Sequence, residues 1–445
     1  MNYLLLLLLS SVGLTAFQQT ASEKTLVTKL ESIRQASSAN DFVESIGVNT
    51  HVNYGDTPYG NYQGLLKPSL VYLGVRHIRD DLADDQFVLN PYRDLHSLGI
   101  QITGLVPYET ASMPALIATI RLQRDVLEAV EGPNETDIFT QFKYKGKGFP
   151  NGTIAFMRDF YPAIKKDPLL RHLPVLQTTL AFPGAAVGKG IRADLLGDLS
   201  GYADYGNSHN YFSFGEFPSD RIKDDHLPLN SRITPGKPMV STEGGYQMGD
   251  GDGYKGIWDD GLSAPFSEEI HGRYLLRYAL EQYRLGYSRS FIYELLDSDR
   301  AKWGLFRADG TPRPAARGLR TMIKLLGEGR WDSGAKRWIA PSLKPRALAY
   351  SVSKLPNSVH SLLFQKSNGR FYLVLWNEVN NWDATTGKAV YSTPVPLTLR
   401  IDQPVKTVRT FSPLTHGTAV TATFDSSILQ LNVPDHPVIV EINLQ

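Results

Sequence analysis

Residues 45–335 alternate between short apolar runs and amphipathic stretches. Runs rich in Val, Ile and Leu are typical of buried strands, and apolar residues at i, i+3, i+4 and i+7 are typical of helices. The pattern predicts strands at residues 45–52, 75–79, 100–106, 127–130, 173–179, 205–211, 238–242 and 290–294. It predicts helices at residues 66–73, 91–98, 112–123, 154–166, 195–200, 267–285 and from 314 onward. This alternation predicts an α/β fold, a closed (β/α)8 TIM barrel.

An open, doubly wound sheet would show the same alternation. However, no Gly-rich phosphate loop follows any predicted strand, and the sequence G-x-x-x-x-G-K-[ST] is absent. The barrel is therefore the favoured fold.

The pattern changes after residue 335, where short β-branched and aromatic runs are separated by turn residues and no helical period remains. This predicts a C-terminal antiparallel β-sandwich. Its strands are expected at residues 347–352, 361–364, 370–376, 395–399, 428–431 and 438–442. We thus predict a barrel domain over residues 22–335, which begins with a short amphipathic helix within 22–40, and a sandwich domain over 336–445.

The N-terminal residues contain the apolar run Leu4–Leu9, followed by small and polar residues. A run of this length is short for a membrane span and predicts a secretory signal, assigned to residues 1–21, with a secreted or periplasmic location. No Lys or Arg precedes the run, which leaves an uncleaved anchor as an alternative. No later stretch has membrane length.

Composition narrows the functional classes. The 445-residue chain has no cysteine, which excludes disulfides, a Cys nucleophile and Cys-ligated metals. Its net charge is +1 with scattered Lys and Arg, which argues against nucleic acid or an acidic membrane surface as a partner. The motifs G-x-S-x-G and H-E-x-x-H are also absent.

Two predicted strands each end in a glutamate. The run 127–131 reaches Gly132-Pro133 and then Asn134 and Glu135, and the run 238–242 is followed by Glu243 and two glycines. Barrel enzymes place their chemistry where strands end. Two carboxylates about 5 Å apart are the requirement of a retaining glycosidase, in which one serves as acid/base and the other as nucleophile. A single strand-end Glu is more often a cap or a surface residue, but two with glycine neighbours favour a functional pair.

Asn134-Glu135 after the fourth strand and Glu243 after the seventh resemble the clan A retaining glycoside hydrolases, many of which join a barrel to a C-terminal β-sandwich. The likeness covers residues 45–445. The Asn-Glu dipeptide alone is a weak motif, since Asn377-Glu378 repeats it in the sandwich. The resemblance is specific because the order of the two glutamates, their spacing and the domain plan all agree with the clan.

The resemblance implies a role for each matching residue. Glu135 would be the acid/base and Glu243 the nucleophile. Arg79, at the end of the second strand, matches an Arg that binds the nucleophile, and His209 or Tyr211 matches the strand-six position beside it.

The same resemblance extends to substrate contacts. Asn134 would bind a sugar hydroxyl. The clan often carries a Trp on strand eight as the floor of the sugar site; here Tyr293 stands in that strand and the next Trp is Trp303.

Less specific interpretations of these residues are also open. Arg79 could instead form a rim salt bridge with Asp80 or Asp81, and His209 and His51 could be polar fillers. The run 250–253 (Asp-Gly-Asp-Gly) resembles a calcium loop but lacks the further ligands, so a Gly-rich lid is the favoured interpretation.

The sequence therefore predicts a secreted retaining β-glycosidase that acts on an oligo- or polysaccharide and needs no metal or organic cofactor. Two alternatives share the scaffold: a carbohydrate-binding protein that has lost activity, and a transglycosylase of envelope polysaccharide metabolism.

Overall fold

In the computed structural model, residues 33–108, 112–188, 190–213, 215–248, 266–298, 302–353, 355–383 and 385–445 are described. The signal segment 1–21 and the Gly-rich run 250–253 lie outside these ranges. Within them, no helix is long and apolar enough to cross a membrane.

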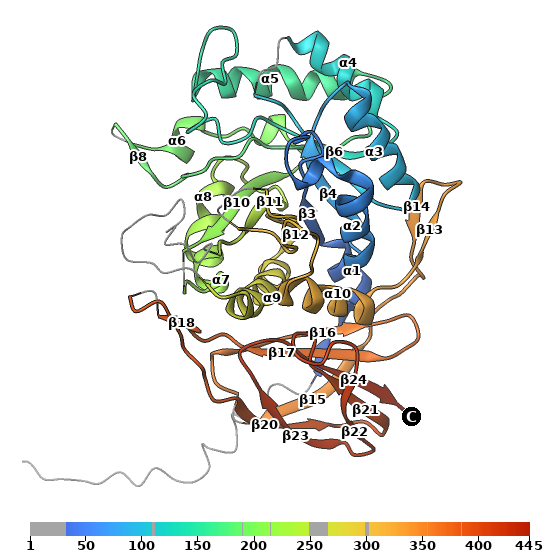
Figure 1. Ribbon diagram of the computed structural model, residues 1–445. Helices are drawn as coiled ribbons and strands as arrows, with labels where there is room; N and C mark the ends of the chain where they lie inside the picture. The colour runs from blue at the N-terminus through green and yellow to red at the C-terminus, as the bar shows by residue number, and fades with distance from the viewer. Residues whose placement is uncertain are drawn as a thin grey trace, which may run out of the picture.

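The larger domain of the molecule is built around eight parallel strands (Figure 1), as predicted. Each pairs with its neighbours in the order β10-β11-β12-β3-β4-β5-β6-β7, and a parallel bridge between Leu176 and Tyr205 joins the two ends of the sheet. The strands are β3 (Ile46–Asn49), β4 (His77–Asp81), β5 (Gln101–Leu105), β6 (Leu127–Glu131), β7 (Val175–Leu176), β10 (Gly206–Phe212), β11 (Met239–Tyr246) and β12 (Tyr287–Ile292). A sheet closed in this way is the predicted TIM barrel.

Helices surround this sheet. They are α1 (Ala39–Glu44), α2 (Lys67–Leu73), α3 (Gln86–Ser97), α4 (Met113–Gln123), α5 (Asn151–Lys166), α6 (Arg192–Leu196), α7 (Pro218–Arg221), α8 (Leu227–Ser231), α9 (Glu268–Arg284) and α10 (Pro314–Leu326), with short turns of helix at 58–60, 62–66, 200–202 and 222–226. Ser112 and Ser267 begin α4 and α9 as expected, because each hydroxyl accepts a hydrogen bond from a backbone N–H of the first turn, 3.3 Å long in both cases.

Several predicted elements differ from the observed ones. The helix expected at 195–200 lies at 192–196, as α6. The strand expected at 173–179 is reduced to β7, and the helix expected at 91–98 starts earlier, because Asp85 caps the N-terminus of α3. The helix predicted within residues 22–40 is wrong for residues 33–38, which form the short strands β1 (Ile33–Gln35) and β2 (Ser37–Ser38).

The C-terminal residues form two packed sheets, in the orders β1-β15-β20-β23 and β2-β16-β17-β24-β21-β22 (Figure 1), which is the predicted sandwich. Strands β1 and β2, which precede the barrel in the sequence, pair with β15 and β16 of these sheets. The remaining strands are β15 (Ala347–Ser353), β16 (Val359–Gln365), β17 (Phe371–Asn377), β20 (Val395–Ile401), β21 (Val405–Phe411), β22 (Val420–Phe424), β23 (Ile428–Val433) and β24 (Val438–Leu444). Three small hairpins lie apart from the main sheets: β8 (Ala186–Val187) with β9 (Gly190–Ile191), β13 (Arg330–Asp332) with β14 (Arg337–Ile339), and β18 (Trp382–Asp383) with β19 (Lys388–Ala389).

The barrel and the sandwich share a hydrophobic core along α9. Trp376 of β17 is fully buried, and its indole Nε1 donates to Glu281 Oε1 of α9 at 3.0 Å. Arg277 of α9 donates to the Val379 carbonyl at 2.7 Å. The sandwich therefore supports the barrel through buried contacts.

Replacement of Trp376 by Ala is expected to lower the free energy of unfolding by about 3–5 kcal/mol, because it leaves a large cavity at this junction and removes one of the hydrogen-bond partners of Glu281. Chemical denaturation with fluorescence detection measures the change. Trp376→Phe is the matched control: it keeps most of the packing and should cost about 1–3 kcal/mol from the lost hydrogen bond to the Glu281 carboxyl group. A cost below about 1 kcal/mol for Trp376→Ala would contradict a shared core.

Candidate active site

A cavity of about 330 Å³ opens at the carboxyl ends of the barrel strands. Its walls come from β4, β5, β10 and β11 and from the segments after β3, β5, β6, β7 and β12. The cavity contains seven of the eight residues selected from the sequence: Arg79, Asn134, Glu135, Tyr211, Glu243, Tyr293 and Trp303. The eighth, His209, lines an adjoining cavity of about 480 Å³ that shares Ala181, Phe182 and Tyr211 with the first.

Glu135 and Glu243 face one another. Each offers a carboxylate oxygen within 4.8 Å of the other and of a His209 nitrogen. Both residues are nearly buried, with exposed fractions of 9% for Glu135 and 8% for Glu243. Glu243 lies inside β11 instead of at its end, because β10 and β11 stay paired as far as Tyr246. The two strands thus bring two carboxylates to one small volume.

The backbone holds Glu135 in an unusual conformation. Its φ is +39°, in the left-handed region that non-glycine residues rarely occupy. Such a residue costs about 1 kcal/mol or more. The Glu135 N–H donates to Thr179 Oγ1 at 3.3 Å, which helps fix this turn and aims the carboxyl group at Glu243.

Glu243 is surrounded by donors. Arg79 Nη1 donates to its Oε1, and the Tyr211 hydroxyl donates to its Oε2 at 2.6 Å. Burial alone would raise the pKa of Glu243, but His209, the Arg79 guanidinium and the Tyr211 hydroxyl together lower it to about 2. This carboxylate is therefore ionised at neutral pH, the state that a nucleophile requires.

Glu135 is in a different environment. Burial raises its pKa, the negative charge of Glu243 adds to the rise, and His209 opposes it. His209 Nδ1 lies 2.6 Å from Glu135 Oε1, and its Nε2 lies 3.2 Å from Thr242 Oγ1. Two carboxyl groups with pKa values displaced in opposite directions are what an acid and a nucleophile need.

Arg79 does not form the rim salt bridge with Asp80 or Asp81 that was one sequence-based alternative. Its guanidinium instead forms a two-point ion pair with Glu131, at 2.7 and 2.9 Å, and donates to Asn134 Oδ1 at 2.8 Å. Asp80 accepts from the Thr50 hydroxyl at 2.5 Å. For Asp80 the reason is strand geometry, because successive side chains of β4 point to opposite sides of the sheet. Asp81 lies on the same side as Arg79 but accepts a hydrogen bond from Asn53 Nδ2 at 2.9 Å.

Asn134 is held by the protein at both ends of its amide. Besides accepting from Arg79, it donates through Nδ2 to the Tyr108 hydroxyl at 2.7 Å. One Nδ2 N–H is left over for a hydroxyl in the cavity.

The aromatic residues form a wall beside Glu243. The ring of Trp303 lies 5.0 Å from that of Tyr211 and 5.8 Å from that of Tyr293, both in edge-to-face geometry. The His51 ring continues this wall, since it meets the Tyr293 ring edge-on at 5.6 Å and stacks on Tyr54 at 4.5 Å. Burial lowers the pKa of His51 to about 4, so its ring is neutral at pH 7.

Sequence reasoning missed several residues of this cavity. Glu131, fully buried, positions Arg79, and Tyr108, Tyr54 and Asp81 line the walls. Glu131 left a usable signal, since it is a buried-strand carboxylate that directly follows the apolar pair Ala129-Val130. Asp81 is the last residue of β4, and Tyr54 and Tyr108 follow β3 and β5 in loops whose sequence carries no comparable pattern.

Glu135, His209 and Glu243 also satisfy the spacing of a three-ligand metal site. However, both oxygens of Glu243 already accept hydrogen bonds, and the Arg79 guanidinium lies against one of them. A metal ion would have to compete with this cation. The arrangement suits proton transfer and nucleophilic attack better than metal binding.

Comparison with solved structures shows the same fold in carbohydrate-active enzymes. A family 39 glycoside hydrolase from Bacteroides cellulosilyticus WH2 superposes with a TM-score of 0.57 at 14% identity, covering 92% of this chain and 83% of that one. A glucosidase from Croceicoccus marinus has a TM-score of 0.54 at 10% identity, covering 85% and 91%. A 4-O-α-L-rhamnosyl-β-D-glucuronidase from Fusarium oxysporum 12S has a TM-score of 0.52 at 12% identity, covering 93% and 98%. No protein-family model and no curated protein sequence matches the chain.

Proposed function

We propose that this protein is a glycoside hydrolase that cleaves β-glycosidic bonds of an oligo- or polysaccharide with retention of configuration. The observation that carries the proposal is the approach of Glu135 and Glu243, which offer oxygens within 4.8 Å of each other. Retaining enzymes hold their carboxyl groups about 5–5.5 Å apart, whereas inverting enzymes need about 6.5–9.5 Å to admit a water. The fold shared with a glucosidase and other glycoside hydrolases supports the same conclusion.

The reaction follows from the two environments. Glu243 attacks the anomeric carbon while Glu135 gives its proton to the departing glycosidic oxygen, and a glycosyl ester on Glu243 results. Ester formation removes the charge of Glu243, one of the causes that raise the pKa of Glu135. Glu135 can then take a proton from water, which attacks the anomeric carbon and releases Glu243.

The remaining residues position these groups. The Tyr211 hydroxyl and Arg79 orient the Glu243 carboxylate and keep it ionised. The rings of Trp303 and Tyr293 offer apolar surface to the C–H face of a sugar. The adjoining cavity, lined by polar side chains such as Glu216, Arg221 and Asp225, gives room for further sugar units.

The pH dependence of kcat/KM tests the assignment of roles. Glu243, with a pKa lowered to about 2, is active when ionised, so activity is lost only as the pH falls toward that value. Glu135, with a raised pKa, is active when protonated, so activity is lost as the pH rises through that pKa. We expect a bell-shaped profile, and Glu135→Gln should remove its alkaline limb. An alkaline limb that persists in Glu135→Gln would assign the acid to another group.

A panel of aryl β-glycosides, with proton NMR of the first sugar released, tests the proposed function itself. The expected result is hydrolysis of at least one β-glycoside with the β-anomer appearing first. First appearance of the α-anomer would contradict retention. Binding without hydrolysis would indicate an inactive carbohydrate-binding protein, and transfer to added sugars in preference to water would indicate a transglycosylase.

We further propose that the protein is exported, on the basis of the apolar run near its N-terminus. Expression of the full chain in a bacterial host and N-terminal sequencing of the mature product test this. A mature protein in the periplasm or medium that starts near residue 22 is expected; retention of residue 1 on a membrane-bound product would favour the anchor.

A further inference from the structure

The cavity that holds Glu135 and Glu243 has two unlike ends. The side chains that line it from β4 and the segment after β3 include the polar groups of Thr50, Asp80 and Asp81. The side chains that line it from the segments after β6 and β7 are largely apolar, and the large ones are Ile138, Phe139 and Phe182. We call these three residues the apolar shelf. A bound glycoside would meet hydroxyl-binding groups at one end and the apolar shelf at the other.

The apolar shelf presents its surface to the cavity instead of to the protein core. Ile138 is 39% exposed and Phe182 is 40% exposed, although both line the cavity. Single exposed apolar residues are common, but neighbouring ones at the edge of a concave site mark a surface that a ligand covers. The gain on binding is the apolar area that leaves water.

The apolar shelf lies directly beside the proposed acid. The backbone N–H groups of Ile138 and Phe139 both donate to the Glu135 carbonyl, at 3.0 Å each, so one tight turn carries the carboxyl group and two shelf residues. The Phe139 ring packs against the Tyr108 ring with centroids 4.5 Å apart. Because Glu135 protonates the departing oxygen, the group attached to that oxygen must lie on this side of the cavity.

Asp137 joins the two segments that form the apolar shelf. Its side chain is fully buried and accepts from the backbone N–H groups of Ala181, at 2.9 Å, and Phe182, at 3.1 Å. Arg192 completes the connection, with an ion pair to Asp137 at 2.7 Å and its guanidinium 5.6 Å from the centre of the Phe182 ring. The shelf is therefore formed before a substrate binds, which lowers the entropy cost of binding.

We propose that the apolar shelf is the leaving-group site, and that it selects glycosides whose leaving group presents an apolar ring face. An aromatic ring and the C–H face of a further sugar share this chemistry. The inference rests on the proposed function, because the role of Glu135 as acid fixes which end of the substrate meets the shelf. Phe182 also lines the adjoining cavity, so a longer leaving group continues there.

Binding of paired glycosides to the full-length protein tests the proposal without requiring hydrolysis. Phenyl and methyl β-glycosides of D-glucose, D-galactose and D-xylose are titrated into Glu243→Gln, which cannot form the glycosyl ester. The ¹⁵N indole signal of Trp303, identified with Trp303→Phe, reports occupancy of the cavity. We expect the phenyl glycoside of a sugar that binds to have a Kd about tenfold below that of its methyl partner, the scale for one ring removed from water.

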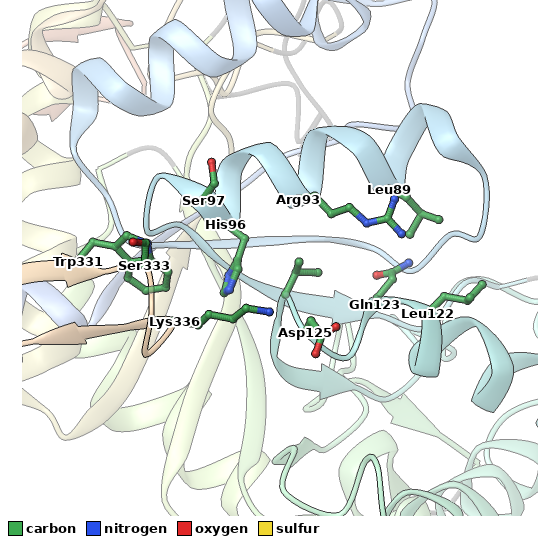
Figure 2. Close-up of a pocket in the computed structure, with 11 residues that line it drawn as sticks. Leu89, Arg93, His96, Ser97, Leu122, Gln123, Asp125, Trp331, Ser333 and Lys336 are labelled. Carbon is green, nitrogen blue, oxygen red and sulfur yellow. The ribbon is translucent and has the colours of Figure 1, made fainter.

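The double variant Ile138→Ala/Phe182→Ala, in the same background, should reduce this preference to about twofold or less and leave the Kd of the methyl glycoside unchanged. Leu122→Ala is the matched control and should keep the full preference. Leu122 is also an exposed apolar residue, at 55%, but Figure 2 shows it beside a cavity at the amino ends of the strands, opposite the proposed active site.

β-Linked disaccharides of the same sugars distinguish the two sources of the ring. A loss of affinity in the double variant as large as that of the phenyl glycosides would identify a further sugar as the leaving group. A loss confined to the phenyl glycosides would identify an aromatic ring.

Three results would overturn the proposal: no binding of any of these glycosides, equal affinity for phenyl and methyl partners, or an undiminished preference in the double variant. A shelf-dependent preference in a protein whose wild type hydrolyses no β-glycoside would support the ring site and refute the proposed hydrolysis. The two failures are therefore distinguishable.

Discussion

Glu243→Gln is expected to lower kcat by about four orders of magnitude or more while leaving sugar binding intact. The amide keeps the shape of the side chain but cannot attack an anomeric carbon, and loss of a covalent nucleophile has effects of this scale or larger in other enzymes. Steady-state kinetics on an aryl β-glycoside measure kcat, and calorimetry with the reaction product measures binding.

The chain supplies a matched control for this change. Glu378 follows Asn377 in the sandwich, so it repeats the Asn-Glu dipeptide away from the cavity. Glu378→Gln should retain near-normal kcat. Near-normal hydrolysis by Glu243→Gln would remove Glu243 from the mechanism.

Glu135→Gln is expected to show an effect that depends on the leaving group. Loss of general acid catalysis should cost about 10²–10⁴-fold in kcat/KM for alkyl glycosides and saccharides, whose leaving oxygen needs a proton. It should cost much less for dinitrophenyl glycosides, whose leaving group departs as an anion. The comparison of these two substrate classes in wild type and variant is the measurement.

Azide provides the second half of that experiment. A small anionic nucleophile needs no general base, so it should restore turnover of dinitrophenyl glycosides by Glu135→Gln and yield a β-glycosyl azide. It should not restore Glu243→Gln in the same way, because the first step is missing there. Equal losses on all leaving groups, with no rescue, would assign Glu135 a structural role.

The barrel could be predicted because its strands are short apolar runs that reach polar residues at one end. Buried parallel strands need apolar side chains on both faces, which leaves a strong signal along the sequence. Glu135 and Glu243 follow two such runs, and closure of the sheet brings them together from positions far apart in the chain. The pair was thus visible as soon as the barrel was recognised.

The elements that were missed lack this signal. Strands β1 and β2 are short, largely polar and paired with residues far along the chain, so nothing local marks them. Strand β21 alternates only in part, because a register shift between Val405 and Thr407 interrupts its pairing with β24. Strand β22 has no buried face. Their positions depend on long-range pairing that composition cannot show.

The partner of Arg79 was also hidden by distance along the chain. Asp80 follows Arg79 directly in the sequence, but Glu131 and Glu243 are its neighbours in space. A strand directs neighbouring residues to opposite faces and places residues of neighbouring strands side by side. The choice of these partners matters for the charge of Glu243, because the Arg79 guanidinium helps to lower the pKa of that carboxyl group.

Trapping of the glycosyl-enzyme tests the central claim most directly. A 2-deoxy-2-fluoro-β-glycoside with a dinitrophenyl leaving group slows release of the intermediate, and peptide mass spectrometry then locates the attached sugar. The account predicts a single adduct on Glu243, formed in the wild type and absent from Glu243→Gln. An adduct on any other residue, or turnover of a β-glycoside by inversion with no adduct at all, would contradict it.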